Sequence, residues 1–93
     1  MIVCEDGRCR VQGPVTMDNV VALLEQGNAL FTAREVAVDL AAVTEVDSSA
    51  VSLLLEWRRA AARGGRSIRY FNLPRNLKSL AELYGVTELI GDN

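Results

Sequence analysis

The stretch from Val36 to Arg59 constrains the fold more than any other part of this chain. It opens with an apolar run, passes a polar junction at Asp47-Ser48-Ser49, and continues as a nearly uninterrupted apolar run from Ala50 to Trp57. The first run is short and rich in β-branched residues, which is typical of a buried strand. The second run is long enough for a helix. The sequence therefore predicts a strand, a connection and a strongly apolar helix in that order.

The polar junction is the natural start of this helix. We predict that the helix begins at Ser48 or Ser49 and runs to Arg63, where Gly64-Gly65 can end it. A side-chain oxygen at a helix start can accept hydrogen bonds from free backbone N–H groups, so Asp47 and both serines are candidate caps. A phosphate added to Ser48 would meet the positive end of the helix dipole. Ser48 can thus be a cap alone or also a contact and modification site.

The first thirteen residues predict a β-hairpin. Asp6-Gly7 is a two-residue turn signal. Centring the turn there makes Cys4 and Cys9 cross-strand neighbours on the apolar face, within reach of a disulfide. In the reducing cytosol that we expect for this chain, the pair is predicted to stay as two reduced, buried thiols.

A helix and a strand are predicted between the hairpin and the junction. Gly13-Pro14 ends the hairpin, and Thr16 can cap a helix that places Met17 and Val21 among its apolar positions. We expect this helix to reach about Thr32, with an end at Gly27 as the alternative. The following strand spans residues 35–40, and residues 41–46 are expected to form a connection.

The last third of the chain predicts one strand and one helix. Residues 67–72 form the strand, and Pro74 fits the first turn of a helix that Gly85 ends. Residues 86–90 are expected to form a short terminal strand or a turn. The order is β-β-α-β-α-β-α, with a last short β left open. Such an order predicts a single α/β domain over residues 1–93, with a mixed sheet of four to five strands and three to four helices.

Composition argues against several classes of function. The 93 residues include no histidine, which removes the commonest general base and metal ligand, and two cysteines alone are too few for a zinc site. We therefore expect no enzyme activity, no catalytic residue, no metal and no cofactor. A net charge of -2 gives no basic field for nucleic acid. No apolar run approaches the ~20 residues of a membrane span, which predicts a cytoplasmic protein.

Trp57 is the only tryptophan, and its role stays open between the core and an interface. The helix that carries it is apolar on nearly all sides in its first turns, so one side either packs deeply or meets a partner. The polar neighbours Ser52 and Glu56 are expected on its exposed side. The predicted partner-binding residues are Asp47, Ser48, Ser49, Ser52, Glu56 and Trp57.

The central stretch resembles a known family. The segments Val38-Asp39-Leu40, Val46 to Val51 and Leu53-Leu54-Leu55 resemble the signature region of the STAS domain, which is named after sulfate transporters and anti-sigma-factor antagonists. The resemblance covers residues 36–90 well and the first 35 residues only in topology. Residues 81–86 and the small size are most similar to one branch. That branch is the cytoplasmic STAS subunit of the ABC-type phospholipid transporter that maintains outer-membrane lipid asymmetry.

The resemblance implies a non-catalytic adaptor with a STAS-like fold that binds the cytosolic ATPase of an ABC-type phospholipid transporter. It implies attachment to the inner membrane only indirectly, through that complex. In this branch a threonine at the place of Ser48 lies close to the ATPase subunit. The alternative is an anti-sigma-factor antagonist, in which the matching serine is phosphorylated by an anti-sigma factor kinase. Both branches commonly have a glycine soon after the hydroxyl residue, whereas this chain has Ala50.

Overall fold

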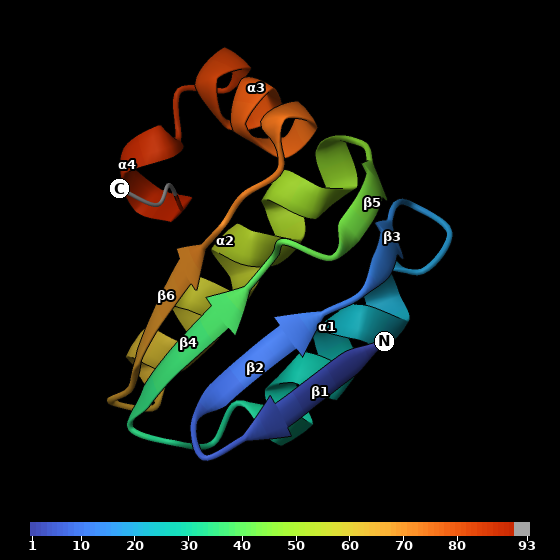
Figure 1. The fold of residues 1–93 in the computed structure, drawn as a ribbon. Helices are drawn as coiled ribbons and strands as arrows, with labels where there is room; N and C mark the ends of the chain where they lie inside the picture. The colour runs from blue at the N-terminus through green and yellow to red at the C-terminus, as the bar shows by residue number, and fades with distance from the viewer. Residues whose placement is uncertain (91–93) are drawn as a thin grey trace.

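A computed structural model describes residues 1–90 of the protein (Figure 1). Six strands and four helices follow one another along these residues. The strands are β1 (Ile2–Glu5), β2 (Arg8–Val11), β3 (Gly13–Val15), β4 (Glu35–Asp39), β5 (Val43–Val46) and β6 (Ser67–Phe71). The helices are α1 (Val20–Leu30), α2 (Ser48–Arg63), α3 (Arg75–Leu83) and α4 (Thr87–Ile90). The predicted start and end of α2 are confirmed.

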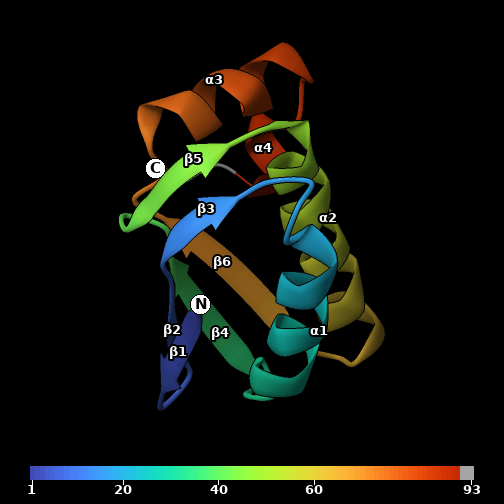
Figure 2. The same ribbon diagram turned by 90° about the vertical axis from the view of Figure 1, so that its right-hand side faces the viewer.

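Within residues 1–90 the strands form two sheets. The larger has the order β1-β2-β4-β6, with β1 antiparallel to β2 and the other pairs parallel, and the smaller pairs β3 with β5. Helices α1 and α2 lie side by side on one face of the larger sheet, while α3 lies over the β3–β5 pair (Figure 2). The predicted mixed α/β architecture is therefore confirmed.

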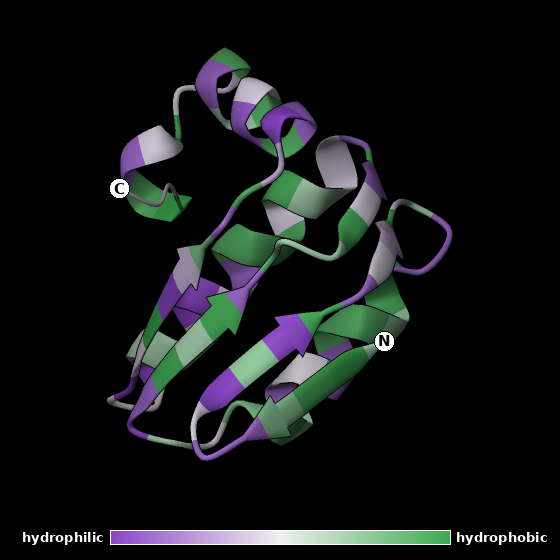
Figure 3. Cartoon of the chain, in the orientation of Figure 1, coloured by the Kyte–Doolittle hydropathy of each residue, from purple (hydrophilic) through white to green (hydrophobic). Residues whose placement is uncertain are grey.

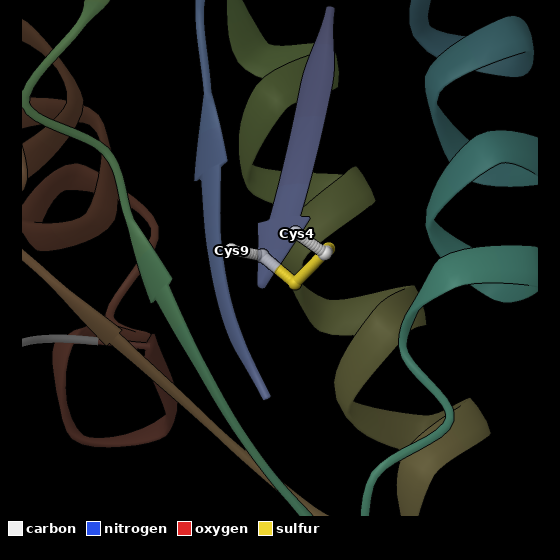
Figure 4. Close-up of a disulfide and its surroundings, with 2 residues drawn as sticks. All are labelled: Cys4 and Cys9. Atoms are coloured by element: carbon white, nitrogen blue, oxygen red, sulfur yellow. A yellow bond between two sulfur atoms is a disulfide. The ribbon is translucent and has the colours of Figure 1, made fainter. Parts of the chain in front are cut away.

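The N-terminal hairpin has the predicted register. Ile2 pairs with Val11, and Cys4 pairs with Cys9. The two cysteines are joined in a disulfide, with their Cα atoms 4.0 Å apart, on the side of the hairpin that faces the helices (Figure 4). The prediction of two reduced thiols is thus wrong for this structure, because the turn brings the two side chains into direct contact.

The core lies between the larger sheet and its helices. Hydrophobic and hydrophilic residues alternate along β2 (Figure 3), and its apolar side chains Cys9 and Val11 are buried. Such alternation is expected of a strand with one face on the core and the other toward solvent. Trp57 of α2 is 2% exposed and packs edge-on against Phe31, with ring centroids 4.9 Å apart.

Close packing against Trp57 explains the glycine inside α1. Gly27 is buried, and a Cβ atom there would overlap the Trp57 indole. The Trp57 Nε1–H donates to the carbonyl of Leu24 at 3.3 Å. Leu24 lies on α1, one turn before Gly27. Gly27 is therefore a site of close approach between α1 and α2, where the sequence predicted only a tolerated helix residue.

Helix α1 differs from its prediction at both ends. It begins at Val20, because Asn19 closes a loop by accepting from the Thr16 N–H and donating to the Pro14 carbonyl. Met17 thus precedes the helix and is 75% exposed, and Val21 also points to solvent. The helix ends at Leu30, two residues before the predicted end.

Two short elements differ from the sequence prediction. Residues 43–46 form β5, because their backbone pairs with β3. Residues 87–90 form α4, not a terminal strand, and this turn buries Ile90. Pairing with a distant segment decides the first case, and the burial of Ile90 accompanies the second. A stretch of four residues does not reveal either contact.

Candidate functional site

Asp47 fixes the junction between β5 and α2. It is the N-cap of α2, and its Oδ1 accepts from the Ser49 N–H at 2.8 Å. Its Oδ2 accepts from the Met17 N–H at 3.0 Å. One carboxylate therefore caps the helix and also holds the loop before α1 against it.

These hydrogen bonds change the acidity of Asp47. The hydrogen bond from the Met17 N–H has the largest effect and lowers the pKa of the carboxyl below its ordinary value. Desolvation opposes it, and the smaller contribution of Ser49 lowers the pKa further. N–H donors stabilise the ionised form, so the carboxylate stays charged over the neutral pH range.

The predicted polar residues of α2 share its exposed side. Ser48 and Ser52 are exposed and lie one helical turn apart. Glu56 follows one turn later and is half-buried, and its carboxylate pairs with Arg59 at 2.9 Å and Arg63 at 3.5 Å. Ser49 is half-buried beside Asp47. The structure thus brings Asp47 and Ser49 together at the helix start and places Ser48, Ser52 and Glu56 along one line.

Two shallow apolar grooves flank this line. A groove of about 390 Å³ lies between α2 and the turn after α3, and it is lined by Ser48, Val51, Ser52, Leu55, Tyr84 and Val86. A second groove of about 280 Å³ lies between α1 and α2 and also touches Ser52 and Leu55. The apolar side chains of these grooves, with two exposed serine hydroxyls between them, form a surface that a protein partner can bury.

Apolar residues that the sequence did not single out border these grooves. Val21 lines the groove beside α1 and is 66% exposed, and Tyr84 lines the other and is 52% exposed. Met17, four residues before Val21, and Leu83, directly before Tyr84, are also exposed. Helical spacing marks such residues as apolar, but it does not say which of them face solvent.

Trp57 is not part of this surface. Its ring is buried between α1 and α2, on the opposite side of α2 from Ser52. The expectation that Trp57 contacts a partner is therefore corrected: it belongs to the core, as do its apolar neighbours Leu53 and Leu54.

Residues 1–90 contain no group of three or more His, Cys, Asp or Glu residues placed to hold a metal ion. Across the same residues, no helix combines the length and apolar character needed to cross a membrane. The Ser48 hydroxyl lies next to a carboxylate that is already occupied by two backbone N–H groups.

Comparisons with known proteins agree with this geometry. The model of the family described as "Mlab, STAS domain" matches residues 3–91. A search of curated proteins found no match. Among solved structures, the anti-sigma factor antagonist SpoIIAA in its unphosphorylated form is similar over 100% of this chain and 86% of its own length. The TM-score of that pair is 0.78 at 15% sequence identity.

A second solved structure, of a protein named Mglu, is similar over 81% of this chain with a TM-score of 0.63 and 24% identity. This chain matches only 20% of Mglu's length, so the likeness concerns one part of a larger protein. At such identities both likenesses concern the fold alone.

Proposed function

The chain belongs to the family described as "Mlab, STAS domain", and from that premise we propose that it is a non-catalytic adaptor for the cytosolic ATPase subunit of an ABC-type phospholipid transporter. The proposed contact surface is the exposed side of α2, formed by Asp47, Ser48, Ser49, Ser52 and Glu56. Membrane attachment is indirect in this proposal, through the transporter complex.

The observation that carries the proposal is that the cap of α2 and the exposed hydroxyl at its start belong to different residues. Asp47 alone provides the side-chain cap, through its bond from the Ser49 N–H. Ser48 is therefore not required as a cap, and its exposed hydroxyl is available to another molecule.

The two grooves provide apolar side chains that such a partner can bury. Leu55 lies between them and is half-buried, with exposed Val21 on one side and Tyr84 on the other. Tyrosine at the edge of an apolar groove supplies a large contact area and a hydrogen-bonding hydroxyl. We expect a partner segment with apolar side chains to cover both grooves and the two serines between them.

A second candidate function is an anti-sigma-factor antagonist switched by phosphorylation of Ser48. The similarity to SpoIIAA over the whole chain favours it. The two functions would use the same surface but bind different partners. The adaptor would be a permanent subunit of its complex, whereas the antagonist would bind its partner reversibly.

Affinity purification of the tagged protein from its native cell, followed by mass spectrometry, separates the two. Recovery of an ABC ATPase supports the adaptor, and recovery of an anti-sigma kinase supports the antagonist. If neither is recovered when the tagged protein is expressed at its native level, both proposals are wrong.

A titration against the recovered partner then tests the surface. A charge at position 48 would have to be desolvated against that partner, which costs several kcal/mol when it is unpaired. Ser48→Glu should therefore weaken binding at least tenfold, about 1.4 kcal/mol, while the melting temperature stays within a few degrees. Ser48→Ala should bind nearly as well as the wild type. Normal binding of a folded Ser48→Glu variant would exclude Ser48 from the contact.

A further inference from the structure

Strand β6 forms one edge of the larger sheet. Its single sheet neighbour is β4, and the pair is parallel. The ladder begins with the Ser67 N–H donating to the Arg34 carbonyl at 2.9 Å and ends with the Leu40 N–H donating to the Phe71 carbonyl at 3.0 Å. Residues 67 and 71 therefore direct their backbone groups toward β4.

Because backbone groups alternate in direction along a parallel ladder, residues 68 and 70 face the other way. The backbone N–H and C=O groups of Ile68 and Tyr70 point outward from the sheet edge. No backbone hydrogen bond from another segment of residues 1–90 reaches these outward groups. An edge of this kind can pair with an added extended segment.

A groove of about 540 Å³ runs beside this edge. It touches Tyr70, whose hydroxyl donates to the Leu54 carbonyl on the helix-covered side, and it touches the next residue, Phe71, whose side chain points to the other face. Leu89 of α4 also lines it. The groove therefore reaches both faces of β6 at the sheet edge. Arg8 of β2 and Ala37 of β4 also line it, so it continues onto the open face of the sheet.

The charge of the groove is one-sided. Among the described residues, three guanidinium groups line it, from Arg8, Arg58 and Arg69, against the one carboxylate of Glu88. None of these three arginines forms an ion pair within residues 1–90. A neighbouring groove, which reaches from β1 across the sheet to Phe71 and shares Arg8 with the first, is lined by two arginines and two acidic residues, so its charges balance.

We propose that the β6 edge binds an extended acidic peptide segment, which adds to the larger sheet as a further strand. The outward backbone groups of Ile68 and Tyr70 supply the main-chain hydrogen bonds. Arg69 and Arg58 receive acidic side chains of the added strand. This site is independent of the surface at the start of α2, because Arg58 lies ten residues beyond Ser48, about 15 Å along the helix.

The test uses the whole protein and an eight-residue peptide of alternating valine and glutamate, with capped ends. A peptide of alternating valine and lysine is the matched control. Isothermal titration should give saturable binding of the glutamate peptide, at least tenfold tighter than that of the lysine peptide. Amide hydrogen exchange at Ile68 and Tyr70 should slow at least tenfold on saturation, and exchange at Cys4 on the opposite edge should not change.

Two variants separate the backbone and charge contributions. Ile68→Pro removes an outward N–H without removing a bond to β4, since proline is tolerated on that side of an edge strand. It should weaken binding at least tenfold. Arg69→Glu should do the same, whereas Arg75→Glu on exposed α3, outside the groove, should change binding less than twofold.

The proposal is overturned if the glutamate peptide shows no saturable binding up to millimolar concentration, or if Arg75→Glu weakens it as much as Arg69→Glu. It is also overturned if the peptide binds without slowing exchange at Ile68 and Tyr70, a measurement that stands even if Ile68→Pro fails to fold. Tighter binding of an eight-nucleotide thymidine strand would indicate a general anion surface and would likewise exclude strand addition.

Discussion

The two sides of α2 have nearly opposite roles in this molecule. The inner side packs Ala50, Leu54 and Trp57 into the core, and all three are buried. The outer side presents Ser48 and Ser52 between two apolar grooves. Substitutions on the inner side should therefore change stability, and substitutions on the outer side should change binding with little effect on the fold.

The largest effect is expected for Trp57→Ala. Loss of a buried tryptophan costs about 3–5 kcal/mol, which lowers the melting temperature of a domain this size by more than about 12 °C. Thermal melts followed by circular dichroism measure it, with Trp57→Phe as the control that keeps an aromatic contact to Phe31. A drop of only a few degrees in Trp57→Ala would remove the basis for assigning this residue to the core.

Gly27→Ala tests the same inner contact from α1. The added Cβ must displace the Trp57 indole, and overpacking of this kind costs about 1–3 kcal/mol, partly offset by about 1 kcal/mol of better helix propensity. We expect a net loss of up to about 2 kcal/mol. Asn28→Ala, at the exposed neighbouring position, should be neutral or slightly stabilising in the same denaturant titration. A Gly27→Ala variant more stable than the wild type would contradict the packing described.

At the outer side, Asp47→Ala and Ser48→Ala form a matched pair. Removal of the cap in Asp47→Ala should cost about 1 kcal/mol of unfolding free energy. Ser48→Ala should stay within about 0.5 kcal/mol of the wild type, because Ser48 is an exposed residue without a capping role. Urea titrations measure both. Equal losses in the two variants would mean that the serine shares the cap.

The smallest effect concerns pH. The folded pKa of Asp47 lies below its ordinary value of 3.8. The stabilisation from its ionised form is therefore complete above that value and is lost as the pH falls through the lower folded pKa. Melting temperatures of the wild type and Asp47→Asn should differ by a constant amount at neutral pH and converge as the pH falls below 3.8. A difference that grows on acidification would contradict the lowered pKa.

Local patterns predicted much of this fold. The Asp6-Gly7 turn and strict alternation gave the register of β1 and β2, because a slip of one residue would reverse the faces of a strand. The apolar run and its polar start gave the bounds of α2. The polar line of Ser48, Ser52 and Glu56 was also predictable, because helical spacing places these residues on one side.

Contacts between distant segments decided the rest. The pairing of β3 with β5 and the bond from the Met17 N–H to Asp47 both join residues that no short window contains. The sequence left the role of Trp57 open between the core and an interface. The close packing of its indole against Gly27 assigns it to the core. The sequence alone determined which residues are apolar and in what order the elements come. Only the tertiary structure decided which apolar side chains reach solvent, because exposure depends on which elements pack against one another.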